Sequence, residues 1–167
     1  MYSVNAGVPK TLVGAVVQWL ARRNKRPETR RALLDIAETP ISPELLPPSP
    51  DGSHTQQTEH TLGPYELHDF FLYRFMRFGD VPARLLFLAE QAFAGRYTRE
   101  ELLSVLRTFL RRFFAQQFKR NCMPDGPAIG SISLSPRGAW QMPSDASSAL
   151  WLCAVEEMEK AMKEGEK

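Results

Sequence analysis

The stretch "YTREELLSVLRTFLRRFFAQQFKR", residues 97 to 120, decides the fold class of this chain of 167 residues. Thr98 and Glu101 have the spacing of a capping box, in which each residue's side chain accepts a backbone N–H of the other at the start of a helix. The apolar residues that follow recur every three or four positions, as one face of a helix requires; they are Leu102, Leu103, Leu106, Phe109, Leu110, Phe113 and Phe114. The stretch therefore predicts an amphipathic helix that buries its phenylalanines and leaves its arginines on the opposite, wet face.

The rest of the chain carries the same helical signals. The first expected helix runs from Pro9 to about Arg22, and the second runs from Pro27 and ends before Pro40. The third lies within residues 63–79. The fourth is capped by Asp80, has Pro82 in its first turn and ends near Gly95, and the last begins near Ser144. The last one leads into a charged tail, residues 156–167, which is expected to fray. No run alternates as a strand would, so the sequence predicts a mainly α fold.

Two segments lack a periodic pattern and are expected to be irregular. One lies between Thr39 and Gly63 and is rich in proline, and the other covers residues 120–144. Loops of more than about 20 residues inside a compact domain are uncommon, and they often serve as linkers, lids or binding loops.

Composition and motifs exclude several classes of protein. The net charge of +2 is far from the one-signed balance of a dedicated nucleic-acid coat, so charge location matters more than charge total. The two cysteines and three histidines show no metal-ligand spacing, and no glycine-rich phosphate loop or GxSxG motif occurs. No apolar run is long enough for a membrane span. The sequence thus predicts a cytoplasmic chain with no metal site, no catalytic residue of its own and no membrane partner.

The cations among the phenylalanines after Thr98 have two interpretations. Arginines alternating with aromatic residues are typical of surfaces that bind single-stranded nucleic acid. Helical periodicity instead favours a core face and a solvated face. That second interpretation does not explain why Lys119 and Arg120 stand at the helix end, where cations interact favourably with the helix dipole and could equally bind a phosphate.

Five blocks of the chain, in order, resemble glutamine-dependent NAD synthetase. They are "YSVNAGVPKTLV", "TPISPELLP", "TEHTLGPYELHDFFLY", "YTREELLSVLRTFLRRFF" and "RRFFAQQFKRNCMPDGPAIGSISLSPRGAWQMPSDAS". The resemblance implies the helical C-terminal portion of a Rossmann-like α/β synthetase domain, without its phosphate-loop half. It also implies ATP-dependent amidation of deamido-NAD through an adenylated intermediate, with Mg²⁺ and with ammonia from glutamine.

The resemblance also implies roles for individual residues. Lys10 and Ser42 match positions that contact ATP, and Lys119 matches a lysine that binds deamido-NAD. Residues 39–65 resemble a loop that orders over the active site, and Arg120 is expected to be structural. The chain departs from the family pattern where Lys, Asp and Arg are common, namely at Ala128, Ala139 and Gln141.

The expected partners are ATP, deamido-NAD, the remaining synthetase and glutaminase domains and further copies of the enzyme, with no nucleic acid. The isolated chain is expected to be inactive. Two alternatives remain: a helical module that completes a separately encoded synthetase body, and a helical module that binds single-stranded nucleic acid.

Overall fold

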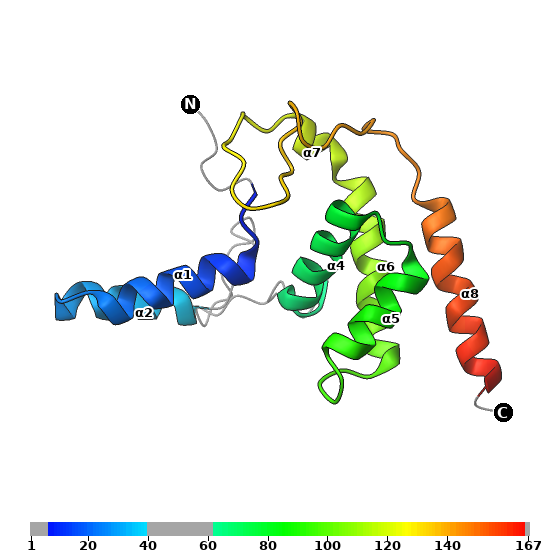
Figure 1. The fold of residues 1–167 in the computed structure, drawn as a ribbon, viewed down its shortest axis with the longest axis horizontal. Coiled ribbons are helices and arrows are strands. Elements are labelled where there is room, and N and C mark those ends of the chain that lie inside the picture. The colour runs from blue at the N-terminus through cyan, green and yellow to red at the C-terminus, as the bar shows by residue number, and fades with distance from the viewer. Residues whose placement is uncertain (1–6, 40–61, 166–167) are drawn as a thin grey trace, which may run out of the picture. The chain divides into compact units, whose positions relative to one another are not determined.

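The computed structural model describes residues 7–39 and 62–165, and these ranges contain helices and no strands. The predicted mainly α fold is therefore confirmed. The chain divides into two compact units, one formed by Pro9–Glu66 and the other by the N-terminal residues up to Val8 together with Leu67–Lys167. Figure 1 labels the helices of both units. Ser42 and most of the predicted lid, residues 40–61, lie outside the described residues.

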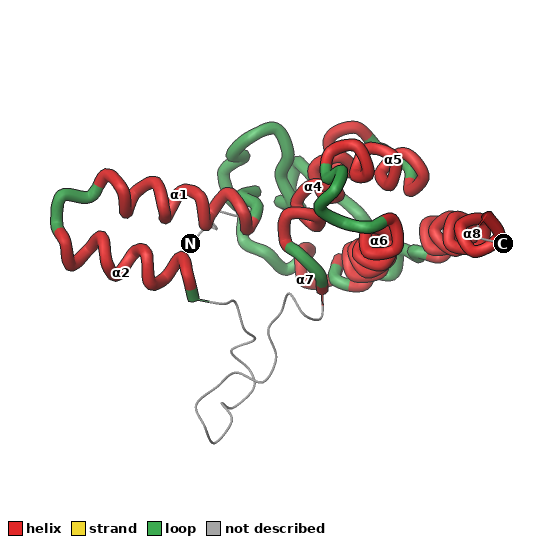
Figure 2. Tube along the Cα trace, turned by 90° about the horizontal axis from the view of Figure 1, so that it is seen from below, coloured by secondary structure: helices red, strands yellow, loops and turns green. Residues whose placement is uncertain are grey.

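The unit that starts at Pro9 is a helical hairpin in its described part. Helix α1 (Lys10–Arg23) and helix α2 (Pro27–Glu38) lie side by side, as Figure 2 shows. In the turn between them, the Asn24 side chain accepts the backbone N–H of Arg26 at 2.9 Å. Proline suits the first position of α2, because the N–H that it lacks would have no partner there. Both helices were predicted, and both are confirmed.

The other unit is a bundle built around one long helix. Its helices are α4 (Tyr65–Phe78), α5 (Pro82–Ala92), α6 (Arg99–Ala115), α7 (Gln117–Asn121) and α8 (Ala149–Gly165). Helix α6 packs against α5 and α8, and α8 also contacts α5. The predicted capping box begins α6: Thr98 Oγ1 accepts the N–H of Glu101 at 3.2 Å, and Glu101 Oε2 accepts the N–H of Thr98 at 2.7 Å.

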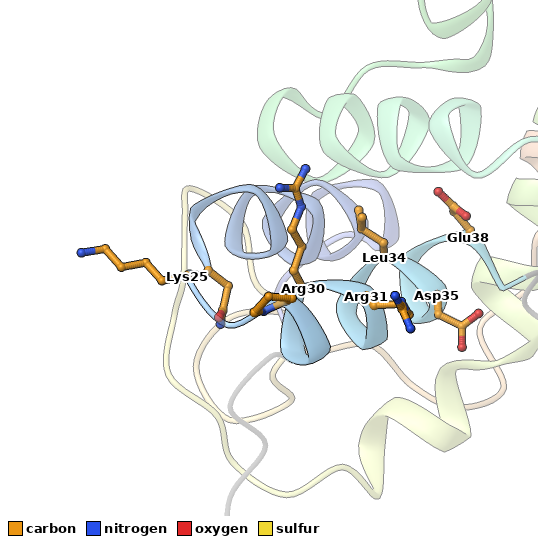
Figure 3. Close-up of a pocket in the computed structure, with 8 residues that line it drawn as sticks. Lys25, Arg30, Arg31, Leu34, Asp35 and Glu38 are labelled. Atoms are coloured by element: carbon orange, nitrogen blue, oxygen red, sulfur yellow. The ribbon is translucent and has the colours of Figure 1, made fainter.

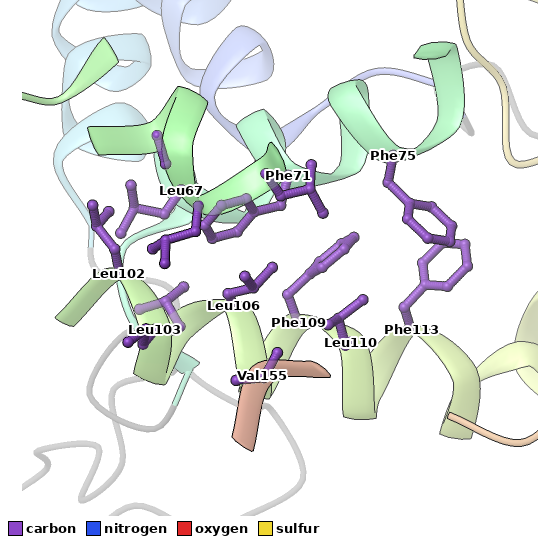
Figure 4. Close-up of a cluster of buried hydrophobic side chains, with 14 of the residues drawn as sticks. Leu67, Phe71, Phe75, Leu102, Leu103, Leu106, Phe109, Leu110, Phe113 and Val155 are labelled. Atoms are coloured by element: carbon purple, nitrogen blue, oxygen red, sulfur yellow. The ribbon is translucent and has the colours of Figure 1, made fainter. Parts of the chain in front are cut away.

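The core of this unit lies along the apolar face of α6. The seven apolar α6 residues predicted to be buried are buried. Figure 4 shows side chains of α4 pointing toward them, among them Phe71 and Phe75, while Val155 of α8 approaches as well. The ring centre of Phe75 lies 5.0 Å from that of Phe113, 5.1 Å from that of Trp151 and 5.8 Å from that of Trp140. Phe75 thus joins α4 to α6, to α8 and to the irregular segment between α7 and α8.

The prediction that Asp80 caps α5 is wrong. The N-cap position is Val81, and no side chain caps α5. Asp80 is buried and pairs instead with Arg74 at 2.6 Å and with Arg84 at 3.1 Å. Two guanidinium groups satisfy a buried carboxylate better than one backbone N–H can, because hydrogen bonds between charged groups are the stronger ones.

The predicted start of α8 is also wrong. The helix begins at Ala149 and not near Ser144, because Ser144 accepts a hydrogen bond from Asn121 (2.7 Å) and is held in the preceding segment. Residues 156–165 of the charged tail are helical in the structure. Arg107 of α6 anchors this part of α8 through Glu156 at 3.3 Å and Glu159 at 2.5 Å. Among the helices described, none combines the length and the hydropathy that crossing a bilayer requires.

Candidate functional site

The short helix α7 is held in place by a network of side-chain amides. Gln117 is fully buried at its centre. The Gln117 amide donates to Asn121 Oδ1 at 2.8 Å, and Gln117 Oε1 accepts from Arg120 Nε at 3.0 Å. Asn121 in turn donates to Ser144 Oγ at 2.7 Å. Helix α7 is therefore tied to the segment that precedes α8, although that segment has no regular structure.

Arg120 attaches α7 to the end of α6. Its guanidinium donates to the carbonyl oxygen of Phe113 and lies 4.3 Å from the centre of the Phe113 ring. Burial lowers the pKa of Arg120 from its usual value, because a charged group loses hydration there. The expectation that Arg120 is structural is confirmed by these contacts.

Lys119 differs from its neighbour, because its side chain is exposed. Within the described part of the chain it forms no ion pair, and its Nζ lies 5.9 Å from the ring centre of Phe118, which is 51% exposed. Chemically, a free ammonium can bind a phosphate and an exposed ring can stack on a planar base or a pyridine. The network around Gln117 holds the backbone that carries both groups. The sequence pattern places Phe118 among the phenylalanines interleaved with the cations, whereas the burial of Gln117 has no signal in it beyond the Gln pair before "FKR".

The irregular segment after α7 is fixed by local contacts. The backbone N–H of Trp140 donates to Ser135 at 3.0 Å, and the Trp140 ring lies 5.5 Å from that of Phe113. Arg137 pairs with Asp125 at 2.8 Å. The three positions that depart from the family pattern are all exposed, namely Ala128, Ala139 and Gln141. These departures therefore change the surface of the segment and leave its packing intact.

Lys10 is the first residue of α1 and is exposed. The preceding Pro9 offers no side-chain cap, and the first turn contains no acidic residue. A cation at a helix N-terminus is unfavourable by a few tenths of a kcal/mol, because the macrodipole is positive there. Helix stability therefore does not explain this lysine. Lys10 and Lys119 belong to different units, and the structure describes each within its own unit.

Metal ligands are not gathered anywhere in residues 7–39 and 62–165, where no three His, Cys, Asp or Glu side chains lie close enough to share an ion. In the described α7 region, the groups that can bind a ligand are thus the Lys119 ammonium and the exposed Phe118 ring, on a backbone that the Gln117 network holds in place. These can bind and orient an anionic, planar ligand.

Comparison with known proteins confirms the resemblance drawn from the sequence blocks. The chain is 35% identical, over 174 aligned positions that cover 93% of it, to the glutamine-dependent NAD(+) synthetase of Mycobacterium leprae. The glutamine-dependent NAD(+) synthetases of Mycobacterium bovis and Mycobacterium tuberculosis match to the same extent. The matched region is the C-terminal quarter of these proteins, so the chain spans 25% of the length of the curated relatives it matches. No protein-family model matches the chain.

Proposed function

We propose that this chain is the C-terminal part of a glutamine-dependent NAD synthetase, which amidates deamido-NAD to NAD with ATP and with ammonia from glutamine. The observation that carries the proposal is the 35% identity over 93% of the chain to synthetases of that name. The helical structure is consistent with it, because the resemblance implied the helical portion of a larger α/β domain.

The proposed roles of the residues follow from the chemistry. Adenylation of the nicotinate carboxyl produces a mixed anhydride that water destroys, so the site must be closed before ammonia attacks. In this proposal the loop over residues 39–65 closes the site, and Lys10 and Ser42 bind ATP. Lys119 binds a phosphate or ribose of deamido-NAD, with its ammonium placed by the α7 network. Mg²⁺ would accompany the phosphates of ATP and neutralise part of their charge.

The surface of α1 supports the view that this chain works as part of a larger assembly. Four apolar residues form a stripe on this helix; they are Leu12, Val13, Val16 and Leu20, each at least 36% exposed. In the described part of the hairpin, Ala21 is the one buried residue. A hairpin with so little buried surface gains little stability from its own packing, so covering the stripe would stabilise it further. We therefore propose that the stripe contacts the rest of the synthetase, and that the isolated chain is inert.

A second candidate function uses the same stripe. The chain would then be a separate helical module that docks on an independently encoded synthetase body. Both candidates predict that the stripe is covered in the active enzyme. Mixing the chain with a separately expressed body discriminates them: recovery of activity supports the module, whereas activity that needs one continuous polypeptide supports the first proposal.

The decisive assay measures amide formation from deamido-NAD, ATP and ammonia. We expect no turnover from the 167-residue chain alone and turnover when the upstream part of the enzyme is present. In the complete enzyme, Lys119→Ala should raise KM for deamido-NAD at least tenfold, on the order of one lost charge-assisted contact. Arg112→Ala is the matched control, because Arg112 is also exposed and lies one helix earlier. Turnover by the isolated chain would contradict the inertness, and an unchanged KM in the Lys119 variant would remove the site assignment.

A further inference from the structure

The end of the α1–α2 hairpin carries a dense group of cations, which we call the basic turn. It consists of six residues within ten positions: Arg22, Arg23, Lys25, Arg26, Arg30 and Arg31. All six are exposed, and Glu28 is the one acidic residue among them in the sequence. From residue 9 to residue 39, seven Lys or Arg face three Asp or Glu, so this region is strongly positive although the whole chain is nearly neutral.

The cations of the basic turn lack counterions within the described residues. None of the six is within 4 Å of a carboxylate of residues 7–39 or 62–165, whereas five arginines of the other unit are; those five are Arg74, Arg84, Arg99, Arg107 and Arg137. Like charges spaced by less than a Debye length of about 8–10 Å repel one another. An anionic partner relieves this repulsion and releases its own counterions when it binds.

The groove beside the basic turn is positively charged at one end and negatively charged at the other. It has a volume of about 500 Å³, and its lining includes Lys25, Arg30 and Arg31 near the turn and Asp35 and Glu38 at the far end of α2. Figure 3 shows Lys25 extending away from the helices while Arg30 extends in another direction, so the positive groups spread over the end of the hairpin. An anion is therefore favoured at the turn and disfavoured toward the carboxylates.

An exposed tryptophan lies beside the cations. Trp19 is 53% exposed, and the Arg23 guanidinium lies 4.8 Å from its ring centre. Cations that follow a phosphate backbone, together with an aromatic ring on which a base can stack, are the two elements that bind single-stranded nucleic acid. An anionic membrane fits less well. Helices that lie on membranes carry cations along the flanks of the apolar face, and α1 has none between Lys10 and Arg22.

We propose that the basic turn and Trp19 form a binding surface for single-stranded nucleic acid, contrary to the sequence-based expectation of no such partner. This surface is separate from the proposed ATP contact at Lys10. Helix α1 has 14 residues, and at 1.5 Å of rise per residue its two ends are about 20 Å apart. The proposal does not depend on the synthetase activity.

The test measures binding of the 167-residue chain to a fluorescent oligothymidylate of about 12 nucleotides by anisotropy at several salt concentrations. Six phosphate contacts predict a slope of log K against log salt of about −4. The variant Arg26→Gln, Arg30→Gln, Arg31→Gln should halve the slope and weaken binding on the order of 100-fold at 0.1 M salt. The control variant Arg111→Gln, Arg112→Gln, Lys163→Gln removes the same charge from exposed positions and should bind like the wild type.

The contribution of Trp19 is tested separately. Trp19→Ala should weaken binding about 5- to 150-fold, as the loss of one stacked base predicts. Gln18→Ala, a truncation at an exposed neighbouring position outside the apolar stripe, should leave binding unchanged. Circular dichroism of each variant checks that the helices persist. The proposal is overturned by equal losses in both charge variants, by salt-independent binding, or by binding to phosphatidylserine vesicles without binding to the oligonucleotide.

Discussion

Arg120 and Lys119 are adjacent cations for which the structure predicts opposite consequences of mutation. Arg120→Ala removes the hydrogen bond to Gln117, the hydrogen bond to the Phe113 carbonyl and the stacking on the Phe113 ring. A hydrogen bond from a charged group contributes about 1.5 kcal/mol or more, and an exposed cation–π contact about 0.5–1 kcal/mol. Part of this free energy is recovered in the variant, because water can hydrogen-bond to the carbonyl of Phe113 that Arg120 no longer contacts. We therefore expect a loss of about 2–3 kcal/mol in the free energy of unfolding, or about 5–10 °C in Tm.

The assay is urea unfolding followed by tryptophan fluorescence in a Trp19→Phe background. Trp140 and Trp151, both next to Phe75, then report on the bundle unit alone. Lys119→Ala should leave the midpoint unchanged, because the side chain is exposed and unpaired within the described residues. Arg120→Lys should fall between the two, because it keeps the charge and loses the planar donor geometry. Equal shifts for Lys119→Ala and Arg120→Ala, or no shift for Arg120→Ala, would refute this account of α7.

Three further predictions concern the bundle. Phe75→Ala should lower the free energy of unfolding of the bundle by about 3–5 kcal/mol, because it leaves a cavity where four aromatic rings meet. Phe78→Ala on the same helix should have a small effect, because Phe78 is 54% exposed. Similar losses for the two variants in urea unfolding would contradict the assigned core. Thr98→Ala should lower the free energy of unfolding by about 1 kcal/mol through loss of the capping box, and Thr98→Ser should restore most of that, as thermal unfolding can show. A double-mutant cycle of Arg107→Ala and Glu159→Ala should give a coupling free energy of about 0.5–1 kcal/mol between the two side chains. This coupling should decrease in 1 M salt, because the pair is partly exposed. A coupling that does not change with salt would contradict an ionic origin.

The contribution of Arg107 to the stability of the bundle changes with pH in a defined direction. The hydrogen bond that Arg107 donates to Glu159 is the main cause that raises the pKa of Arg107, and Glu156 adds to it. A raised pKa for a cation means stability that is present at low and neutral pH and lost only as the pH rises through the strongly alkaline range. The Arg107 titration therefore leaves bundle stability flat with pH near neutrality.

Part of the candidate site was predictable from the sequence. Lys119 was predicted at the end of the helix that follows Thr98; the structure ends that helix at Ala115 and places Lys119, exposed, on the separate short helix α7. What could not be predicted is how α7 is fixed, because Asn121 reaches Ser144, 23 positions away, and Gln117 is buried by packing that periodicity does not report. The ATP contacts and the lid stay predictions, since Ser42 and most of residues 39–65 lie outside the described residues.

The sequence by itself determined the features that depend on residues within about four positions of one another. These include the helical period of α6 and the reciprocal hydrogen bonds of Thr98 and Glu101, because a helix turn closes over that distance. The tertiary structure decided the rest. Asp80 is well placed in the sequence to cap α5, but in the structure it pairs with two arginines. The acidic start of the tail is helical and contacts Arg107, which lies 49 positions before Glu156 and 52 before Glu159. A side chain takes the partner that satisfies its charge best, and folding rather than sequence spacing decides which partners come within reach.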